Sequence, residues 1–261
     1  MVDNWHTAIT AVRPNTIQLR GYPIEELMGR KTFAEVVWLA LKGELPSPPE
    51  GKLLDAILVS SVDHGVTPPS TLAARVAAST GAPVNAALAA GVLSVNRFHG
   101  GAVEGCMAAL AEALAYMKEK GVSREEAAAA IIEKLRAAGR RVPGFGHRLH
   151  DDDPRATRLF ALADELGLAR EGVPMARALE AALAKATGKA LPLNVDGAIA
   201  ACLLDLGFEG DVANAFFILA RLPGWLAHVL EERRRERPMR RIEPSSWEYD
   251  GPAERHVTEG K

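Results

Sequence analysis

Residues 101–138 read GAVEGCMAALAEALAYMKEKGVSREEAAAAIIEKLRAA. Alanine and leucine dominate this stretch, and both are strong helix formers. Gly121 interrupts it, and Ser123 follows with Glu126 three residues later. This spacing is typical of a capping box, in which the serine and glutamate side chains satisfy each other's free backbone N–H groups. The stretch therefore predicts two consecutive helices that are joined at Gly121.

The same composition continues on both sides, and glycine and proline cut it into helical lengths. Further helices are expected over residues 32–41, 52–62, 70–79, 83–94, 154–166, 174–186, 196–206 and 211–235. The only segment that suits a strand is short, at Thr16 to Leu19, and the residues from Pro244 onward suit an extended tail. The sequence therefore predicts an all-α fold that forms a single unit over residues 1–261.

The overall composition excludes several classes of protein. Of the 261 residues, 48% are hydrophobic and 25% are charged, which suits a folded chain rather than a disordered one. The net charge of −2 provides no field that would hold nucleic acid. No apolar run is expected to span a membrane, because the stripe from Val36 to Leu41 ends at Lys42. No apolar signal region follows Met1, so a cytoplasmic location is expected.

Loops at the ends of predicted helices carry residues suited to chemistry. The loop RVPGFGHR presents His147 and two arginines before a helix, and adjacent arginines suit phosphates. The sequence FHGG places His99 at a helix N-terminus, where the helix dipole lowers the pKa of an imidazole and keeps it neutral. Asp196 begins another helix, and His64 ends one. Three histidines and one aspartate in such places indicate acid–base chemistry.

Metal, serine-nucleophile and dinucleotide sites are not indicated. The histidines lie far apart in sequence and no HExxH motif occurs, so no metal site is expected. No G-x-S-x-G motif occurs, and Gly144-Phe145-Gly146 lacks the third glycine of a dinucleotide fingerprint. Cys106 and Cys202 lie among apolar residues without a CxxC partner, so we expect buried thiols rather than a disulfide or a zinc site.

Several motifs in a fixed order give the chain a resemblance to a known family. They are RGYPIEEL (20–27), GELP (43–46), STLAARVAAST (70–80), FHGGA (98–102), PGFGHR (143–148), DPR (153–155), NVD (194–196), AR (220–221) and GWLAH (224–228). Together they resemble the citrate synthase superfamily over about residues 16–252. The resemblance implies that family's helical fold, with a large helical domain and a reduced small domain. The smaller, CoA-side subdomain would cover approximately residues 121–205.

The resemblance assigns the chemistry to three residues, which would join or split acetyl-CoA and oxaloacetate through citryl-CoA. Asp196 would take a proton from the acetyl methyl group, His99 would donate a hydrogen bond to the thioester oxygen, and His147 would protonate the oxaloacetate carbonyl. A weakly acidic C–H bond needs such a desolvated base, and a fixed donor at the developing charge is worth ~3 to 4 kcal/mol. In the lyase direction, His147 takes the hydroxyl proton and Asp196 protonates the departing enol.

The resemblance also implies how the substrates bind. His64, Arg155 and Arg221 would bind the carboxylates of the second substrate, because arginine pairs well with carboxylates. The adenine end of CoA would lie in the loop formed by Val142, Pro143, Gly144, Phe145 and Gly146. The CoA thioester enters as a substrate, and no permanently bound cofactor is implied.

One further arginine would come from a partner subunit. Arg240 is the candidate by this resemblance, and Arg237 and Arg241 are close enough in sequence to be alternatives. A shared arginine implies a homodimer or a homotetramer. The arginine-rich run near residue 235 is interrupted by glutamates, so a solvated helix end is favoured over a nucleic-acid-binding arm.

The direction of the reaction follows less directly from the sequence. The helices usual between Pro46 and His64 are mostly missing, which resembles citryl-CoA lyases and the lyase module of ATP-citrate lyase. His99, in contrast, resembles the synthases. We therefore expect a citryl-CoA lyase, with a short citrate synthase or 2-methylcitrate synthase as the alternative. A non-catalytic homologue that binds CoA or citrate is a second alternative, which the presence of a base disfavours.

Simpler roles stay open for single residues. Taken alone, Asp196 would be expected to cap a helix, and Arg155 and Arg221 would be expected to form ion pairs. His228 lies on an apolar helix, and we expect a structural role for it. Only the joint placement of the histidines, the aspartate and the arginines, in the order of the family, favours the catalytic interpretation.

Overall fold

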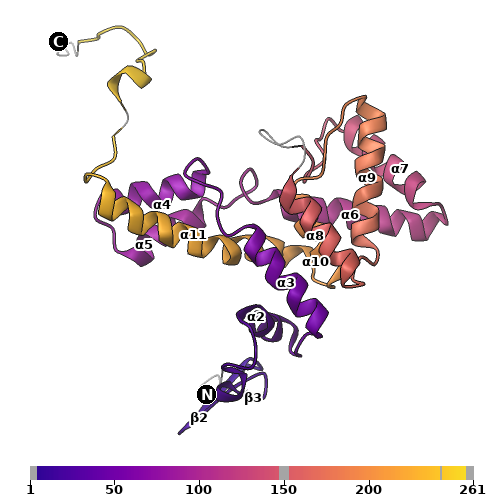
Figure 1. The fold of residues 1–261 in the computed structure, drawn as a ribbon. Coiled ribbons are helices and arrows are strands. Elements are labelled where there is room, and N and C mark those ends of the chain that lie inside the picture. The colour runs from indigo at the N-terminus through magenta and orange to yellow at the C-terminus, as the bar shows by residue number, and fades with distance from the viewer. Residues whose placement is uncertain (1–4, 147–152, 242, 257–261) are drawn as a thin grey trace.

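The computed structural model describes residues 5–146, 153–241 and 243–256, and the described part is mainly helical (Figure 1). The helices are α1 (Ile24–Leu27), α2 (Phe33–Lys42), α3 (Pro48–Ser60), α4 (Pro69–Ser79), α5 (Val84–Leu93), α6 (Ala102–Lys120), α7 (Arg124–Ala137), α8 (Pro154–Glu165), α9 (Gly172–Thr187), α10 (Val195–Asp205) and α11 (Ala213–Arg235), with short 3-10 turns at η1 (Gly210–Val212) and η2 (Pro244–Ser246). The predicted all-α class is confirmed.

A small antiparallel sheet precedes the helices. It contains β1 (Thr10–Arg13), β2 (Thr16–Leu19) and β3 (Tyr22–Pro23), in the spatial order β1-β2-β3. The sequence predicts β2 only. The two flanking strands are four and two residues long, and all of β1 is exposed, so neither carries the alternating apolar pattern by which a strand is recognised.

The helix boundaries follow from capping side chains. The predicted capping box at Ser123 is present: its Oγ accepts a hydrogen bond from the Glu126 amide at 3.2 Å, and the Glu126 carboxylate accepts one from the Ser123 amide at 2.9 Å. A similar box at Ser47 starts α3 four residues earlier than expected. Helix α3 also ends earlier, at Ser60, so His64 does not end a helix but lies in the loop that follows.

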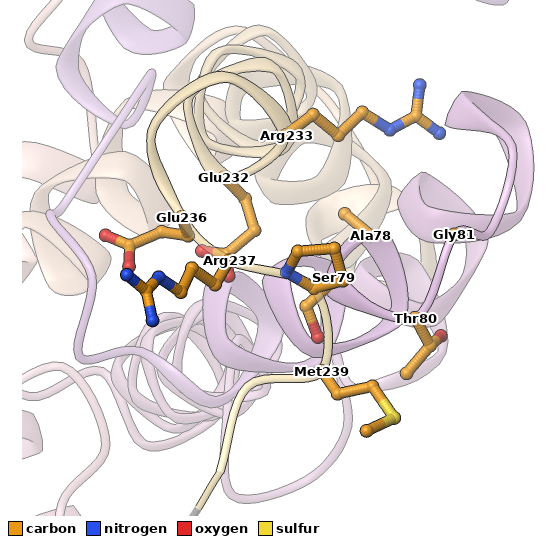
Figure 2. A pocket seen from close by; sticks show the side chains of 10 residues that line it. Ala78, Ser79, Thr80, Gly81, Glu232, Arg233, Glu236, Arg237 and Met239 are labelled. Carbon is orange, nitrogen blue, oxygen red and sulfur yellow. The ribbon is translucent and has the colours of Figure 1, made fainter.

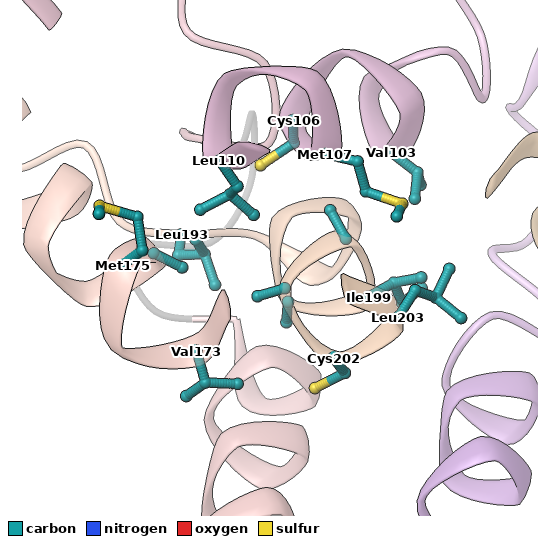
Figure 3. Close-up of a cluster of buried hydrophobic side chains, with 14 of the residues drawn as sticks. Val103, Cys106, Met107, Leu110, Val173, Met175, Leu193, Ile199, Cys202 and Leu203 are labelled. Carbon is teal, nitrogen blue, oxygen red and sulfur yellow. The ribbon is translucent and has the colours of Figure 1, made fainter. Parts of the chain in front are cut away.

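The main core is formed where α6, α9 and α10 meet (Figure 3). Met107 and Leu110 of α6, Met175 of α9 and Ile199 of α10 are fully buried there. In Figure 1, α6 to α10 gather on one side of the molecule, while α4 and α5 pack along α11 on the other. Helices α7 to α10 of this group fall within the subdomain predicted over about residues 121–205. The boundaries of that subdomain stay a prediction.

The two cysteines are buried in this core as free thiols, as predicted. Burial raises the pKa of the Cys106 thiol to about 12, with a smaller contribution from the charge of Asp196. Burial raises the pKa of the Cys202 thiol as well. Both side chains therefore pack as small apolar groups.

The expectation that no segment is long and apolar enough to span a membrane is wrong for residues 210–235, which include α11. Length and composition alone meet that test, and the core helix of a folded domain passes it too. In this protein the helix packs against α3, α4, α5 and α6. It buries Phe216, Trp225 and Val229, so its apolar length serves the interior of the protein.

A single carboxylate fixes the start of α9. Asp205, at the end of α10, is 5% exposed and accepts hydrogen bonds from the backbone amides of residues 170, 171, 172 and 173 at 2.7–3.2 Å. The first amides of a helix have no partner within the helix, so a buried carboxylate satisfies them and also suits the helix dipole.

We predict that Asp205→Ala lowers the free energy of unfolding by about 2–4 kcal/mol, because four backbone amides lose a charged acceptor. Denaturant unfolding would measure this change. Asp55, which is exposed on α3, provides the control, and Asp55→Ala should change the stability by less than about 0.5 kcal/mol. Equal effects of the two substitutions would contradict the role of Asp205.

Candidate active site

The carboxylate of Asp196 stands at the start of α10 but does not cap it. Asn194 is the N-cap, and its Oδ1 accepts hydrogen bonds from the amides of Asp196 at 3.0 Å and Gly197 at 3.2 Å. Burial raises the pKa of the Asp196 carboxyl, while the charges of Arg155 and Arg221 lower it in part. The carboxylate is therefore free for chemistry and is more basic than an exposed aspartate.

Arg221 lies at the centre of the predicted residues. Its side chain is buried on α11, and its Nε donates a hydrogen bond to the Ser61 carbonyl at 2.6 Å. The guanidinium lies over the ring of Phe217, 4.9 Å from its centroid. Burial lowers the pKa of Arg221, and the charge of Asp196 opposes this shift. Because the charge of Arg221 also acts on His99, these three groups share one electrostatic environment.

His99 is fixed by two residues that the sequence does not identify. Its Nε2 lies 2.6 Å from Ser70 Oγ, and the same oxygen accepts a hydrogen bond from Trp225 Nε1 at 3.1 Å. The hydroxyl hydrogen of Ser70 can be donated to His99 Nε2, and in that arrangement the imidazole hydrogen lies on Nδ1. The ring also contacts the Phe217 ring edge-on, at 5.7 Å between centroids.

The His99 imidazole is held neutral by its surroundings. Burial lowers its pKa, and the positive charge of Arg221 lowers it further. The sequence predicts the same direction from the helix dipole, but the causes found in the structure are burial and Arg221. A neutral imidazole with hydrogen on Nδ1 can donate a hydrogen bond to an oxygen that gains negative charge.

Asp153 joins Arg155 to the start of α10. Its buried carboxylate accepts hydrogen bonds from Arg155 Nε and Nη2, both at 2.9 Å, and from the Val195 amide at 3.0 Å. Burial would raise the pKa of Asp153, but the bonds and charge of Arg155 and the Val195 amide outweigh it and lower that pKa. The predicted site does not include Asp153, although its close spacing to Arg155 in the motif DPR signals this pair.

The loop Val142–Gly146 packs directly against the segment that leads to Asp196. The Gly144 carbonyl accepts a hydrogen bond from the Asn194 amide at 3.0 Å, and the Gly146 carbonyl accepts one from Asn194 Nδ2 at 2.8 Å. A Cβ at Gly144, whose φ is +82°, would lie 2.7 Å from the Gly197 Cα. Only glycine suits this approach, so the predicted CoA loop and the predicted base form one rigid unit.

Of the two remaining predicted histidines, only His64 lies within the described residues. His64 is exposed in the loop between α3 and α4, and the Asp63 carboxylate accepts a hydrogen bond from the Gly65 amide of that loop at 3.0 Å. The same loop is tied to Arg221 through Ser61. His147 lies outside the described residues, so its predicted role stays a prediction.

Arg240 is paired within its own chain. Its Nε and Nη2 donate to the Glu232 carboxylate at 2.9 and 2.5 Å, and Arg75 Nε donates to the same buried carboxylate at 2.7 Å. Arg237 and Arg241 make no hydrogen bond or ion pair with the described residues. In this chain, Nε and Nη2 of Arg240 are thus occupied by Glu232. That Arg240 reaches a partner's site stays a prediction.

A cleft of about 520 Å³ lies beside this ion pair, between the end of α4 and the end of α11 (Figure 2). Glu236 and Arg237 point to the same side of it, while Arg233 reaches toward the turn after α4 and donates to the Ala82 carbonyl. Among the described residues, no group of three or more His, Cys, Asp or Glu side chains is placed to hold a metal ion.

The fold and the sequence match one family of proteins. Residues 47–243 match the model of the citrate synthase C-terminal domain. The chain belongs to the citrate synthase family. It is 34% identical over 194 residues to putative citrate synthase 2 of Mycobacterium tuberculosis and 31% identical over 223 residues to citrate synthase 2 of Bacillus subtilis. These matches cover 72% and 84% of this chain but 49% and 56% of the relatives, so the chain spans about half the length of the curated relatives it matches.

Solved structures of the citrate synthase family share the fold. A citryl-CoA lyase from Hydrogenobacter thermophilus matches with a TM-score of 0.89 and 38% identity over 97% of each chain. Citrate synthase from Thermoplasma acidophilum, solved with carboxymethyl coenzyme A and oxaloacetate, matches with a TM-score of 0.70 and 27% identity over 87% of this chain and 59% of that one. The resemblance to the citrate synthase superfamily is confirmed.

We predict that His99 titrates below pH 6.5, the value of an unperturbed histidine, and that Arg221→Gln raises this pKa. The sign follows because a nearby positive charge opposes protonation of the ring, and the substitution removes that charge. NMR of histidine-labelled protein would measure the shift, with the His99 signal assigned through His99→Gln. A His99 pKa that is normal, or that does not respond to Arg221→Gln, would show that the two side chains are not neighbours.

Proposed function

We propose that this protein is a citryl-CoA lyase, which splits citryl-CoA into acetyl-CoA and oxaloacetate and can run the reverse condensation. One observation carries the proposal: the partly desolvated carboxylate of Asp196 shares its surroundings with the neutral imidazole of His99 and with two arginines. Removing a proton from the methyl group of a thioester requires a base of raised pKa and a fixed donor at the thioester oxygen.

The residues divide the reaction between them. In condensation, the Asp196 carboxylate takes a proton from the acetyl methyl group, and His99 Nδ1 donates a hydrogen bond to the enolate oxygen. The enolate carbon attacks the keto carbon of oxaloacetate, and the oxygen of that carbonyl takes a proton from His147. In cleavage, His147 removes the hydroxyl proton of citryl-CoA. The C–C bond between the hydroxyl-bearing carbon and the thioester's methylene carbon breaks, and Asp196 returns a proton to the enol carbon.

The charges of the site suit a dicarboxylate beside a thioester. Arg155 and Arg221 supply positive charge next to Asp196, and we assign them, with His64, to the carboxylates of oxaloacetate. Asp153 occupies Nε and Nη2 of Arg155, so the guanidinium has a fixed direction before substrate binds. The loop Val142–Gly146 would hold the adenine end of the CoA thioester. Its hydrogen bonds to Asn194 would then place the thioester relative to Asp196.

The lyase direction is favoured by the match with the Hydrogenobacter citryl-CoA lyase, which covers 97% of both chains. A short citrate synthase is the alternative, favoured by His99 and by the curated relatives named as citrate synthases. The products distinguish them. A lyase converts citryl-CoA into acetyl-CoA and oxaloacetate, whereas a synthase given acetyl-CoA and oxaloacetate rapidly releases citrate and free CoA.

We also propose that the protein acts as a homo-oligomer in the cytoplasm. Helix α5 is apolar except for Asn85, yet Ala87 and Gly91 are its only buried residues in the described chain. Leu93 of α5 is 78% exposed, and Leu72 and Val76 of α4 are also exposed. A second copy that covers this pair of helices would bury them. The free, buried thiols suit a reducing compartment.

The first prediction for this function concerns the base. Asp196→Asn keeps the shape of the side chain and removes its basicity, so turnover of citryl-CoA should fall by about 10²- to 10⁴-fold. Binding of CoA and oxaloacetate, measured by calorimetry, should persist, and Asp55→Asn serves as the control. Unchanged turnover in Asp196→Asn would reject Asp196 as the base. A wild-type protein that binds both ligands but neither forms nor splits citryl-CoA would favour the non-catalytic alternative.

A second prediction concerns the shared arginine. Asp196→Asn chains are mixed with chains that carry one of the substitutions Arg240→Ala, Arg237→Ala or Arg241→Ala. If the substituted arginine completes the partner's site, each of the two variants is inactive when tested alone. After random exchange of subunits, half of the dimers are heterodimers, and each heterodimer has one intact site and one inactive site. About a quarter of the wild-type activity should therefore return. Size-exclusion chromatography checks that the mixed chains associate. No recovery with any of the three arginines would mean that none of them completes a partner's site.

A further inference from the structure

One face of α11 holds the loop that follows α3. Arg221, Gly224 and His228 are three and four residues apart, so they lie on the same side of the helix. Arg221 Nε donates to the Ser61 carbonyl at 2.6 Å. A Cβ at Gly224 would lie 2.2 Å from the Val62 carbonyl oxygen, so the loop backbone rests directly on the helix there.

The loop turns around the carboxylate of Asp63. Its Oδ2 accepts a hydrogen bond from the Gly65 amide at 3.0 Å, and the His64 amide also bonds to this carboxylate. Burial would raise the pKa of Asp63, but these amides and His228 outweigh it and lower that pKa. The carboxylate therefore stays ionised as an acceptor and fixes the backbone on both sides of the His64 side chain.

His228 supplies the contact that ties this carboxylate to the helix. Its Nε2 lies 3.0 Å from Asp63 Oδ1, on the oxygen that the Gly65 amide does not use. The other ring nitrogen, Nδ1, is buried without a hydrogen-bond partner among the described residues, and Glu231 Oε2 is 3.8 Å from it. The hydrogen bond to Asp63 is therefore the specific contact that the imidazole makes, beyond filling space.

We infer that His228 is a positioning residue, which acts through Asp63 to hold the loop in the conformation that presents His64 to the substrate carboxylate. Arg221 anchors the loop three residues before His64, whereas His228 anchors it at the residue directly before His64. The role of His64 in this inference rests on the proposed function. The contacts that anchor the loop are independent of that function. This positioning role is more specific than the structural role that the sequence predicts for His228.

Two amide substitutions test the anchor. The side-chain nitrogen of glutamine can occupy the place of Nε2, so His228→Gln can keep the hydrogen bond to Asp63. Asparagine is one methylene shorter and cannot reach, so His228→Asn provides the matched comparison. We expect the Gly65 amide to exchange with solvent at least about tenfold faster in His228→Asn and within about threefold of wild type in His228→Gln. Amides of α7, far from the loop in Figure 1, should exchange alike in both variants.

Kinetics provide the second readout. KM for oxaloacetate in the condensation direction should rise about tenfold or more in His228→Asn with kcat within about threefold of wild type, and His228→Gln should restore it. Equal exchange of Gly65 in the two variants, or equal KM values, would overturn the inference. If His228→Asn does not fold, His228→Met, which fills the space without a hydrogen-bond donor, replaces it, and the same two readouts apply. A wild-type protein without condensation activity would instead reject the proposed function, while the exchange experiment would still decide the anchor.

Discussion

The guanidinium of Arg221 is removed from water, with 4% of the residue exposed, and it must be compensated there. A buried charge costs several kcal/mol unless hydrogen bonds and opposite charges surround it. The Ser61 carbonyl, the face of the Phe217 ring and the charges of Asp63 and Asp196 provide this compensation. These groups lie on three segments of the chain, namely the loop after α3, helix α11 itself and the start of α10. Satisfying one buried arginine therefore brings the predicted base, the His64 loop and the His99 surroundings into one place.

The contacts that start α10 also fix the position of the predicted base, Asp196. Asn194 caps the helix and bonds to the loop Val142–Gly146, and Asp153 bonds to the Val195 amide as well as to Arg155. The predicted base is thus held in place without a side-chain hydrogen bond of its own to the described residues. This arrangement leaves its carboxylate oxygens for a substrate, at a helix N-terminus whose dipole partly stabilises the ionised form.

The sequence predicts those parts of the molecule that local pattern determines. The capping box at Ser123, the helix starts at Pro154 and near Asp196, and the buried cysteines follow from spacing and composition, and the structure confirms them. The family motifs identify Arg155, Arg221 and His99 in advance, and the structure brings these groups together electrostatically with Asp196.

Contacts between distant segments are what the sequence does not predict. Ser70 meets Trp225 and His99 only once α4, α11 and the loop before α6 are packed together. The sequence makes Arg240 a candidate for a partner's site, but it does not reveal that Glu232, eight residues earlier, accepts hydrogen bonds from it. By length and composition, α11 could span a membrane. Its packing against α3, α4, α5 and α6 is what shows that it is an interior helix of the fold. No local pattern contains this information, because each of these contacts depends on the tertiary arrangement.

The proposed abstraction of a proton by Asp196 from the methyl group of acetyl-CoA can be tested directly. The protein is incubated with acetyl-CoA and oxaloacetate in deuterium oxide, and the recovered acetyl-CoA is analysed by mass spectrometry. We expect deuterium in the acetyl group with the wild-type protein and none above background with Asp196→Asn, because a reversible lyase returns the enolate to acetyl-CoA. Equal incorporation of deuterium by the two proteins would show that another group removes the proton and would contradict this account.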